Sequence, residues 1–87
     1  MDLTFPNASR SYDVTRDAVR FWGYVSAIEF SFFMTADALR RVAPDLGNDK
    51  ASLLEAFDAH RELIYKTAAK VFARGQRGSY ELVPADF

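Results

Sequence analysis

The chain has 87 residues, of which 49% are hydrophobic and 26% charged, and it contains no cysteine. These values predict one ordered domain over residues 1–87 and exclude a disulfide framework and thiol chemistry. The formal net charge of −1 argues against a nucleic-acid-binding domain, because phosphate binding usually leaves a basic excess. The longest uncharged stretch, 21–28, is far shorter than the roughly 20 residues of a membrane span. Because the N-terminus also shows no secretion signal, we expect a cytoplasmic protein that does not bind membranes.

The N-terminal segment predicts little regular structure. The alternating residues 3–5 end at Pro6 and predict a short edge strand. Residues 7–17 are polar enough for a loop, in which we expect Tyr12 and Val14 to be held against the core.

Residues 19–24 and 28–33 alternate between apolar and other side chains, which predicts an antiparallel hairpin. With a tight turn at Val25-Ser26, the expected pairs on the apolar side are Val19 with Phe32, Phe21 with Phe30 and Gly23 with Ile28. That turn lacks the Gly or Asn that two-residue hairpins favour, so Gly23 could instead mark a bulge or a wider loop. The other side of the hairpin carries Arg20, Trp22, Tyr24, Glu29 and Phe33.

Two helices are expected next. Thr35 is a suitable cap for a short helix that begins at Ala36 and ends before Pro44. Asn48 or Asp49 caps a long helix that we expect to run to about Arg74. The apolar stripe of this long helix consists of Leu53 or Leu54, Phe57, Ile64, Ala68 and Val71.

The alternation of residues 79–83 predicts a last strand, with Tyr80 and Leu82 facing inward. The element order is then β-β-β-α-α-β, which is typical of an α+β fold with two layers. We expect a mainly antiparallel sheet of three to four strands with two helices packed on one face.

Short segments along nearly the whole chain resemble a small bacterial family, the domain of unknown function 1488. They are Leu3-Thr4-Phe5-Pro6, Val19-Arg20-Phe21, Ala38-Leu39, Phe57-Asp58-Ala59-His60-Arg61, Ile64, Ala68 and Asp86-Phe87. The resemblance implies a compact α+β fold in the bacterial cytoplasm and implies no activity, substrate or ligand. His60 departs from the family, which has a polar residue such as Asn at this position, so the resemblance gives this imidazole no special role.

Two residues of the predicted long helix could carry chemistry. His60 is the single histidine, and no partner residues for general base catalysis or metal binding converge on it in the sequence. Arg61 falls on the stripe between Phe57 and Ile64, where a guanidinium needs a carboxylate or several carbonyls. We therefore expect a structural tie from Arg61 to Asp86 or Asp13, with binding of an anionic ligand as the alternative.

The chain has no nucleophile elbow, glycine-rich phosphate loop or metal-binding motif, so we expect a non-enzymatic protein without metal or cofactor. The candidate partner surface is the face formed by Arg20, Trp22, Tyr24 and Phe33, whose residue types suit a protein interface, with another protein or a second copy of the chain. Two alternatives remain for this face. It could be covered by the N-terminal segment through Phe5 and Tyr12, or it could bind single-stranded nucleic acid weakly through its aromatics with Arg16, Arg20 and Arg77. An enzyme centred on His60 or Arg61 is a third class.

Overall fold

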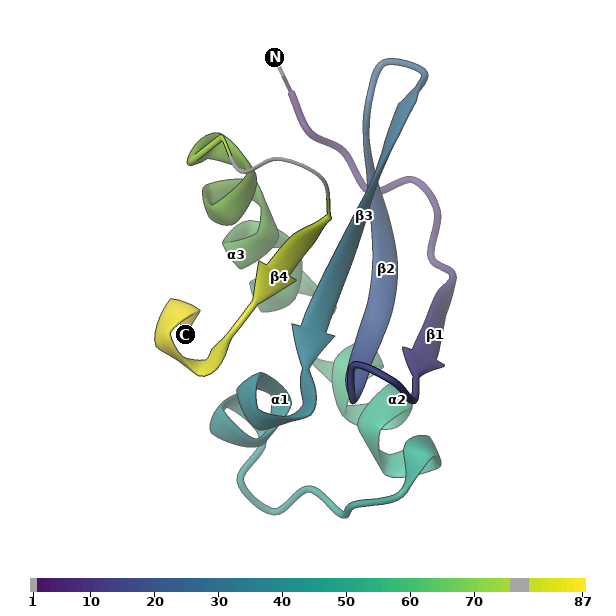
Figure 1. Ribbon diagram of the computed structural model, residues 1–87, viewed down its shortest axis with the longest axis vertical. Helices are drawn as coiled ribbons and strands as arrows, with labels where there is room; N and C mark the ends of the chain where they lie inside the picture. The colour runs from purple at the N-terminus through teal and green to yellow at the C-terminus, as the bar shows by residue number, and fades with distance from the viewer. Residues whose placement is uncertain (1, 76–78) are drawn as a thin grey trace.

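A four-stranded sheet with three α-helices forms the protein, as seen in a computed structural model that describes residues 2–75 and 79–87 (Figure 1). The elements in chain order are β1 (Arg10–Asp13), β2 (Ala18–Val25), β3 (Ile28–Thr35), α1 (Ala36–Val42), α2 (Lys50–Ala59), α3 (Arg61–Ala73), β4 (Tyr80–Leu82) and the 3-10 turn η1 (Pro84–Asp86). The strand order is β1-β2-β3-β4, and α2 and α3 lie behind the sheet in Figure 1. The expected α+β class is confirmed, with three helices where two were expected. No helix among the described residues is long and apolar enough to cross a membrane.

The sheet is mixed. β1, β2 and β3 pair antiparallel, whereas β4 pairs parallel to β3. The chain leaves β3, passes through all three helices and returns to the edge of the same sheet. A connection of this length allows the returning strand to run in the same direction.

The hairpin of β2 and β3 forms with a register different from the expected one. Its turn lies at Ser26-Ala27, one residue later than predicted, and Ser26 takes a φ of 53°. Each expected partner therefore moves by two residues, so that Val19 pairs with Met34 and Phe21 with Phe32. Because a shift of two residues preserves the face of every side chain, the predicted separation into two faces is correct although the pairs are wrong.

Gly23 is neither a bulge nor part of a wider loop, because it pairs in register with Phe30. A Cβ atom at this position would lie 2.9 Å from ring carbons of both Phe5 and Phe32, and 3.0 Å from Leu3. The glycine thus makes room for the N-terminal segment to pack on the sheet.

That N-terminal segment follows β2 without forming a full strand. The expected edge strand at residues 3–5 is reduced to one antiparallel bridge, in which Thr4 and Tyr24 exchange backbone hydrogen bonds of 2.8 and 2.9 Å. The edge strand is instead β1, inside the segment that was predicted to be a loop. In the turn after β1, Val14 is 79% exposed, so the expectation that it is held against the core is wrong.

The expected long helix is broken at His60, whose φ of −120° and ψ of 22° end α2 and start α3. The predicted caps are confirmed: Thr35 accepts a hydrogen bond from the Ala38 amide, and Asp49 accepts one from the Ser52 amide. The break lets α2 pack against β1 and β2 while α3 packs against β4.

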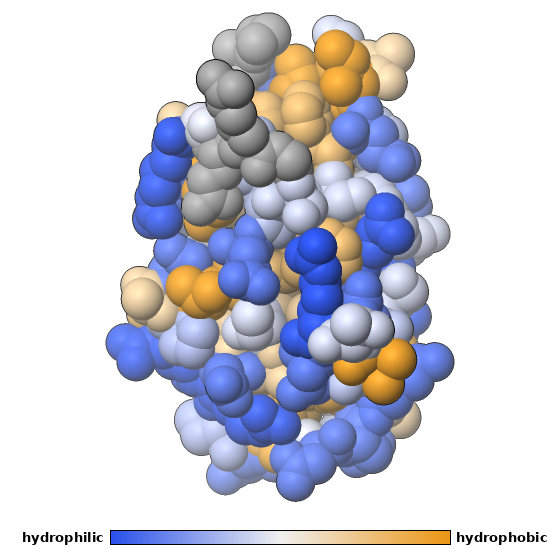
Figure 2. Space-filling model, in the orientation of Figure 1, coloured by the Kyte–Doolittle hydropathy of each residue, from blue (hydrophilic) through white to orange (hydrophobic). Residues whose placement is uncertain are grey.

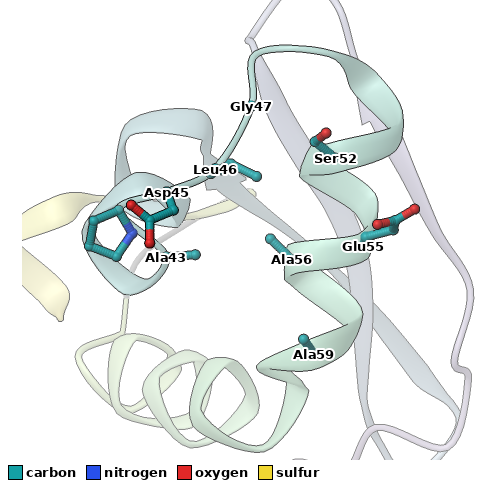
Figure 3. Close-up of a pocket in the computed structure, with 9 residues that line it drawn as sticks. Ala43, Asp45, Leu46, Gly47, Ser52, Glu55, Ala56 and Ala59 are labelled. Atoms are coloured by element: carbon teal, nitrogen blue, oxygen red, sulfur yellow. The ribbon is translucent and has the colours of Figure 1, made fainter.

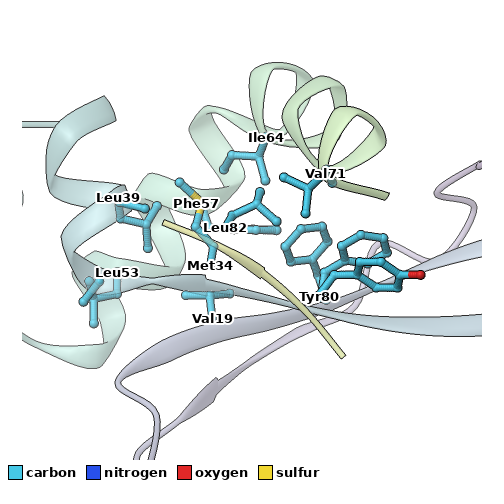
Figure 4. Close-up of a cluster of buried hydrophobic side chains, with 14 residues drawn as sticks. Val19, Met34, Leu39, Leu53, Phe57, Ile64, Val71, Tyr80 and Leu82 are labelled. Atoms are coloured by element: carbon cyan, nitrogen blue, oxygen red, sulfur yellow. The ribbon is translucent and has the colours of Figure 1, made fainter. Parts of the chain in front are cut away.

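The core lies between the sheet and the helices (Figure 4) and contains the predicted stripe of α2 and α3. Its members include Val19, Met34, Leu39, Leu53, Phe57, Ile64, Val71, Tyr80 and Leu82. Tyr80 and Leu82 face inward, as expected. Phe21 is completely buried beside this group, and its ring centre lies 5.0–6.1 Å from those of Phe5, Phe32, Phe57 and Tyr65.

Candidate functional site

The face of the sheet opposite the helices, called the outer face here, is built by the alternation of the strands. β2 places Arg20, Trp22 and Tyr24 on it, and β3 places Phe33 directly beside Arg20. β4 adds Glu81, which pairs with Phe33 from the other side. Figure 2 shows this side of the molecule as mostly blue and pale, with the orange atoms gathered mainly at the end that holds the β2–β3 turn.

Phe33 is only 6% exposed although none of the described helices covers the outer face (Figure 1). The reason is a layer of two arginines. The guanidinium carbon of Arg16 lies 4.0 Å from the centre of the Phe33 ring, and that of Arg20 lies 5.6 Å from it and 5.2 Å from the Trp22 ring. These distances are typical of cation–π contacts. The alternative in which Phe5 and Tyr12 cover these aromatics does not occur, because both pack against the core on the helix side.

Each of the two arginines also donates a hydrogen bond to a side-chain hydroxyl. Arg20 Nη2 donates to Ser31 Oγ at 3.0 Å, and Arg16 Nη1 donates to Ser79 Oγ at 3.4 Å. Neither arginine forms a salt bridge with a carboxylate within residues 2–75 and 79–87. In the same residues, the Nε of Arg20 is shielded from solvent and has no hydrogen-bond partner. Such an unsatisfied donor is costly, and a charge-assisted hydrogen bond to an anionic group would offset this cost.

Tyr24 lies at the far end of the outer face and is engaged in other contacts. Its hydroxyl donates to Glu29 Oε2 at 2.6 Å and accepts a bond of 3.3 Å from Asn7. The structure therefore brings together Arg20, Trp22 and Phe33, and with them Arg16, which the nucleic-acid alternative named and which comes from the turn before β2. Arg77, named in the nucleic-acid alternative, lies outside the described residues.

Arg61 forms a structural tie, but with partners other than the expected ones. Its guanidinium donates to Asp58 Oδ1 at 2.6 Å, to the backbone carbonyl of Ala8 at 2.7 Å and to the Tyr65 hydroxyl. The helix is thus fastened to the N-terminal segment. The expected pairs with Asp86 and Asp13 are wrong.

Asp86 belongs to a separate contact near the C-terminus. Its carboxylate accepts a hydrogen bond of 3.0 Å from Arg74 and one of 2.9 Å from the backbone amide of Val83. This carboxylate joins the end of α3 to η1. Arg61 and Asp86 therefore make contacts within the chain at two different places of the fold.

Asp58 is shared by two arginines, since Arg10 Nη2 also lies 2.8 Å from its Oδ2 atom. The hydrogen bond from Arg10, and then that from Arg61, hold the pKa of the Asp58 carboxyl below its usual value. A lowered pKa in the folded state favours folding above the pKa of the unfolded chain, about 3.9 for an Asp. This contribution is lost as the pH falls through the lower, folded-state pKa.

We expect Asp58→Asn to reduce the free energy of unfolding by about 1 kcal/mol at pH 7, since the pair is partly exposed. The difference between the wild type and the variant should shrink as the pH is lowered from 5 to 3. Urea unfolding at several pH values measures this difference, with Asp2→Asn as the control, because Asp2 is exposed and forms no salt bridge within residues 2–75 and 79–87. A difference that stays constant with pH would contradict the role given to the Asp58 charge.

The remaining candidates show no catalytic arrangement. His60 lies at the junction of α2 and α3, and no cluster of three or more His, Asp or Glu residues in the described ranges could hold a metal ion. An open groove of about 440 Å³, which the sequence analysis missed, lies between the α1–α2 loop and α2 (Figure 3). Its floor is formed by Ala43, Leu46, Ala56 and Ala59. Its one serine, Ser52, donates to Asp49 Oδ1 at 2.7 Å as part of the helix cap, and the lining contains the carboxylates of Asp45 and Glu55 but no histidine.

Comparisons with known proteins support the resemblance seen in the sequence. A family model described as "Protein of unknown function (DUF1488)" matches residues 3–83. A solved structure, described as a protein of unknown function from the DUF1488 family of Shewanella loihica PV-4, has a TM-score of 0.83 and 18% sequence identity, with 94% of each chain covered. At this identity the likeness shows the fold alone. No curated protein matches the chain, and neither description names an activity, a ligand or a partner.

Proposed function

The chain belongs to the DUF1488 family of proteins of unknown function, and we propose that it is a non-enzymatic module that binds a protein partner through the outer face of its sheet. The observation that carries this proposal is the cluster of Arg16, Arg20, Trp22 and Phe33, called the arginine–aromatic cluster below. It lies in the middle of the outer face, which none of the helices in the described part of the chain covers (Figure 1).

The composition of the cluster is that of an interface centre. Trp and Arg are the residues most enriched among those that dominate binding energy, because they combine a large apolar area with directed hydrogen bonds. Here the arginines already lie over aromatic rings, which reduces the side-chain entropy that is lost when a partner binds. The partner is another protein or a second copy of the chain, and we place the interaction in the bacterial cytoplasm, in line with the bacterial source of the structural relative.

Single-stranded nucleic acid is the second candidate, because arginines beside aromatic rings and a half-buried tryptophan also suit bases. Two acidic side chains on the same face, Glu29 and Glu81, disfavour a continuous phosphate chain. Affinity for an oligonucleotide that falls steeply with salt would support this candidate over a protein partner.

Trp22→Ala is the test of the proposal. We expect the immobilised wild-type protein to retain a specific protein from a bacterial lysate and the variant to retain it at least tenfold more weakly. Leu63→Ala is the matched control, since Leu63 is 46% exposed on α3 and lies away from the outer face. Thermal unfolding of both variants would show that they are folded.

Sedimentation equilibrium of the wild type and Trp22→Ala, over a wide concentration range, tests whether the partner is a second copy. A dimer that dissociates in the variant identifies self-association as the function of the face. Equal retention by the wild type, Trp22→Ala and Leu63→Ala, with the same oligomeric state in all three, would refute the proposal.

A further inference from the structure

The charges of the outer face have a pattern that goes beyond its aromatic content. The two cations lie at the centre, because the guanidinium carbons of Arg16 and Arg20 are both within 5.6 Å of the centre of the Phe33 ring. They are consequently at most 9.6 Å apart. Like charges at this separation repel each other, and an anion that lies between or above them offsets this repulsion.

Acidic side chains lie around this centre. Glu81 is on the far side of Phe33 from Arg20 in the same row of the sheet. Asp13 is on the edge strand β1, and Glu29 is held by Tyr24 near the hairpin turn. None of the three forms a salt bridge with Arg16 or Arg20 within residues 2–75 and 79–87. The outer face therefore has a positive centre and a negative rim.

This charge pattern favours a partner with one short anionic group over a partner with an extended anionic chain. A polyanion that crosses the face places phosphates over the rim acids, where they are repelled. A second copy of the chain, laid face to face, brings four arginines together at the centre. A single short anionic group, flanked by neutral or basic groups, matches both the centre and the rim.

From this charge pattern, and building on the proposed function, we infer that the partner is a protein segment that presents one or two adjacent Asp or Glu carboxylates, flanked by neutral or basic residues. The planar guanidinium groups are suited to such carboxylates, because arginine binds them with two parallel hydrogen bonds. Trp22 then lies beside the carboxylates and contacts the apolar part of the same segment.

Peptide display against the whole protein tests this inference. We expect the selected peptides to share one or two central carboxylates with neutral or basic neighbours. Binding of a synthetic copy is followed by the fluorescence of Trp22, the single tryptophan of the chain. Replacing the carboxylates of the peptide by Gln should weaken binding at least tenfold, and so should raising the salt concentration from 50 to 500 mM.

Matched variants of the protein complete the experiment. The double variant Arg16→Gln with Arg20→Gln should bind the peptide at least tenfold more weakly. The double variant Lys66→Gln with Lys70→Gln, which removes two exposed charges from α3, should bind it like the wild type. Replacing both arginines by Lys keeps the charge but loses the planar fork, so an intermediate affinity is expected.

Several outcomes would overturn the inference: no enriched peptide, enriched peptides without carboxylates, full binding by the arginine-to-glutamine variant, or tighter binding of a ten-nucleotide oligo(dT). A lysate protein that is lost with Trp22→Ala but kept by the arginine-to-glutamine variant would leave the proposed function intact and remove only the acidic partner. If both variants still retained the lysate protein, the proposed function and the acidic partner would both be ruled out.

Discussion

Phe21→Ala is expected to lower the free energy of unfolding by about 3–5 kcal/mol. The Phe21 side chain is completely buried, and four other aromatic rings from the N-terminal segment, the neighbouring strand and both long helices surround it. Truncation loses the transfer free energy of the ring and leaves a cavity. The rigid neighbouring rings can only partly close it.

Urea unfolding, followed by far-UV circular dichroism, measures this effect. Small domains are stable by about 5–15 kcal/mol, so Phe21→Ala should leave a chain that is barely folded at 37 °C. Phe21→Leu keeps most of the apolar volume and should cost on the order of 1.5 kcal/mol. If the alanine variant lost no more than the leucine variant, Phe21 would not be the centre of the aromatic packing.

The inward position of Phe21 was predictable because it depends on alternation alone. A strand places residues 19, 21 and 23 on one face whichever partner lies opposite. The register depends on the turn, and Ser26 adopts a positive φ without being Gly or Asn. No local signal distinguishes a turn at Ser26-Ala27 from one at Val25-Ser26, so the pairs were wrong by two residues while the faces were correct.

The break at His60 is a different case, because the sequence carries no glycine or proline there. Residues 50–73 have a nearly continuous helical stripe, and helix propensity favours one helix. The break allows Phe57 to pack under Phe21 and Val71 to reach the core beside β4. This requirement arises from the tertiary structure and overrides the local preference.

The candidate site was predictable to the same extent as the strands that carry it. Arg20, Trp22 and Phe33 follow from the alternation of β2 and β3, and they do lie together. Arg16 comes from an irregular turn, where periodicity gives no orientation, and its contact with Phe33 spans 17 positions of the chain. Contacts of this kind depend on the complete fold.

Arg61→Met is expected to lower the free energy of unfolding by about 1.5–3 kcal/mol, the range measured for hydrogen bonds to charged groups. The variant removes the bonds to Asp58, to the Ala8 carbonyl and to the Tyr65 hydroxyl. Asp58 keeps Arg10 as a partner, so the loss is smaller than that for an isolated buried carboxylate. Urea unfolding measures this loss, with Lys66→Met as the control for an exposed cation on the same helix.

The same variant distinguishes a structural tie from an anion site. A tie predicts that the N-terminal segment is released, so the Thr4 and Tyr24 amides, which bond across the bridge, should exchange with solvent faster in Arg61→Met. Arg61→Lys keeps the charge beside Asp58 but lacks the fork that also reaches Ala8 and Tyr65, so its exchange rates should be intermediate. An anion site predicts unchanged stability and exchange, because its arginine would have free donors in the absence of ligand. Arg61 already donates to three acceptors within the chain, and this is the physical reason to expect the first result.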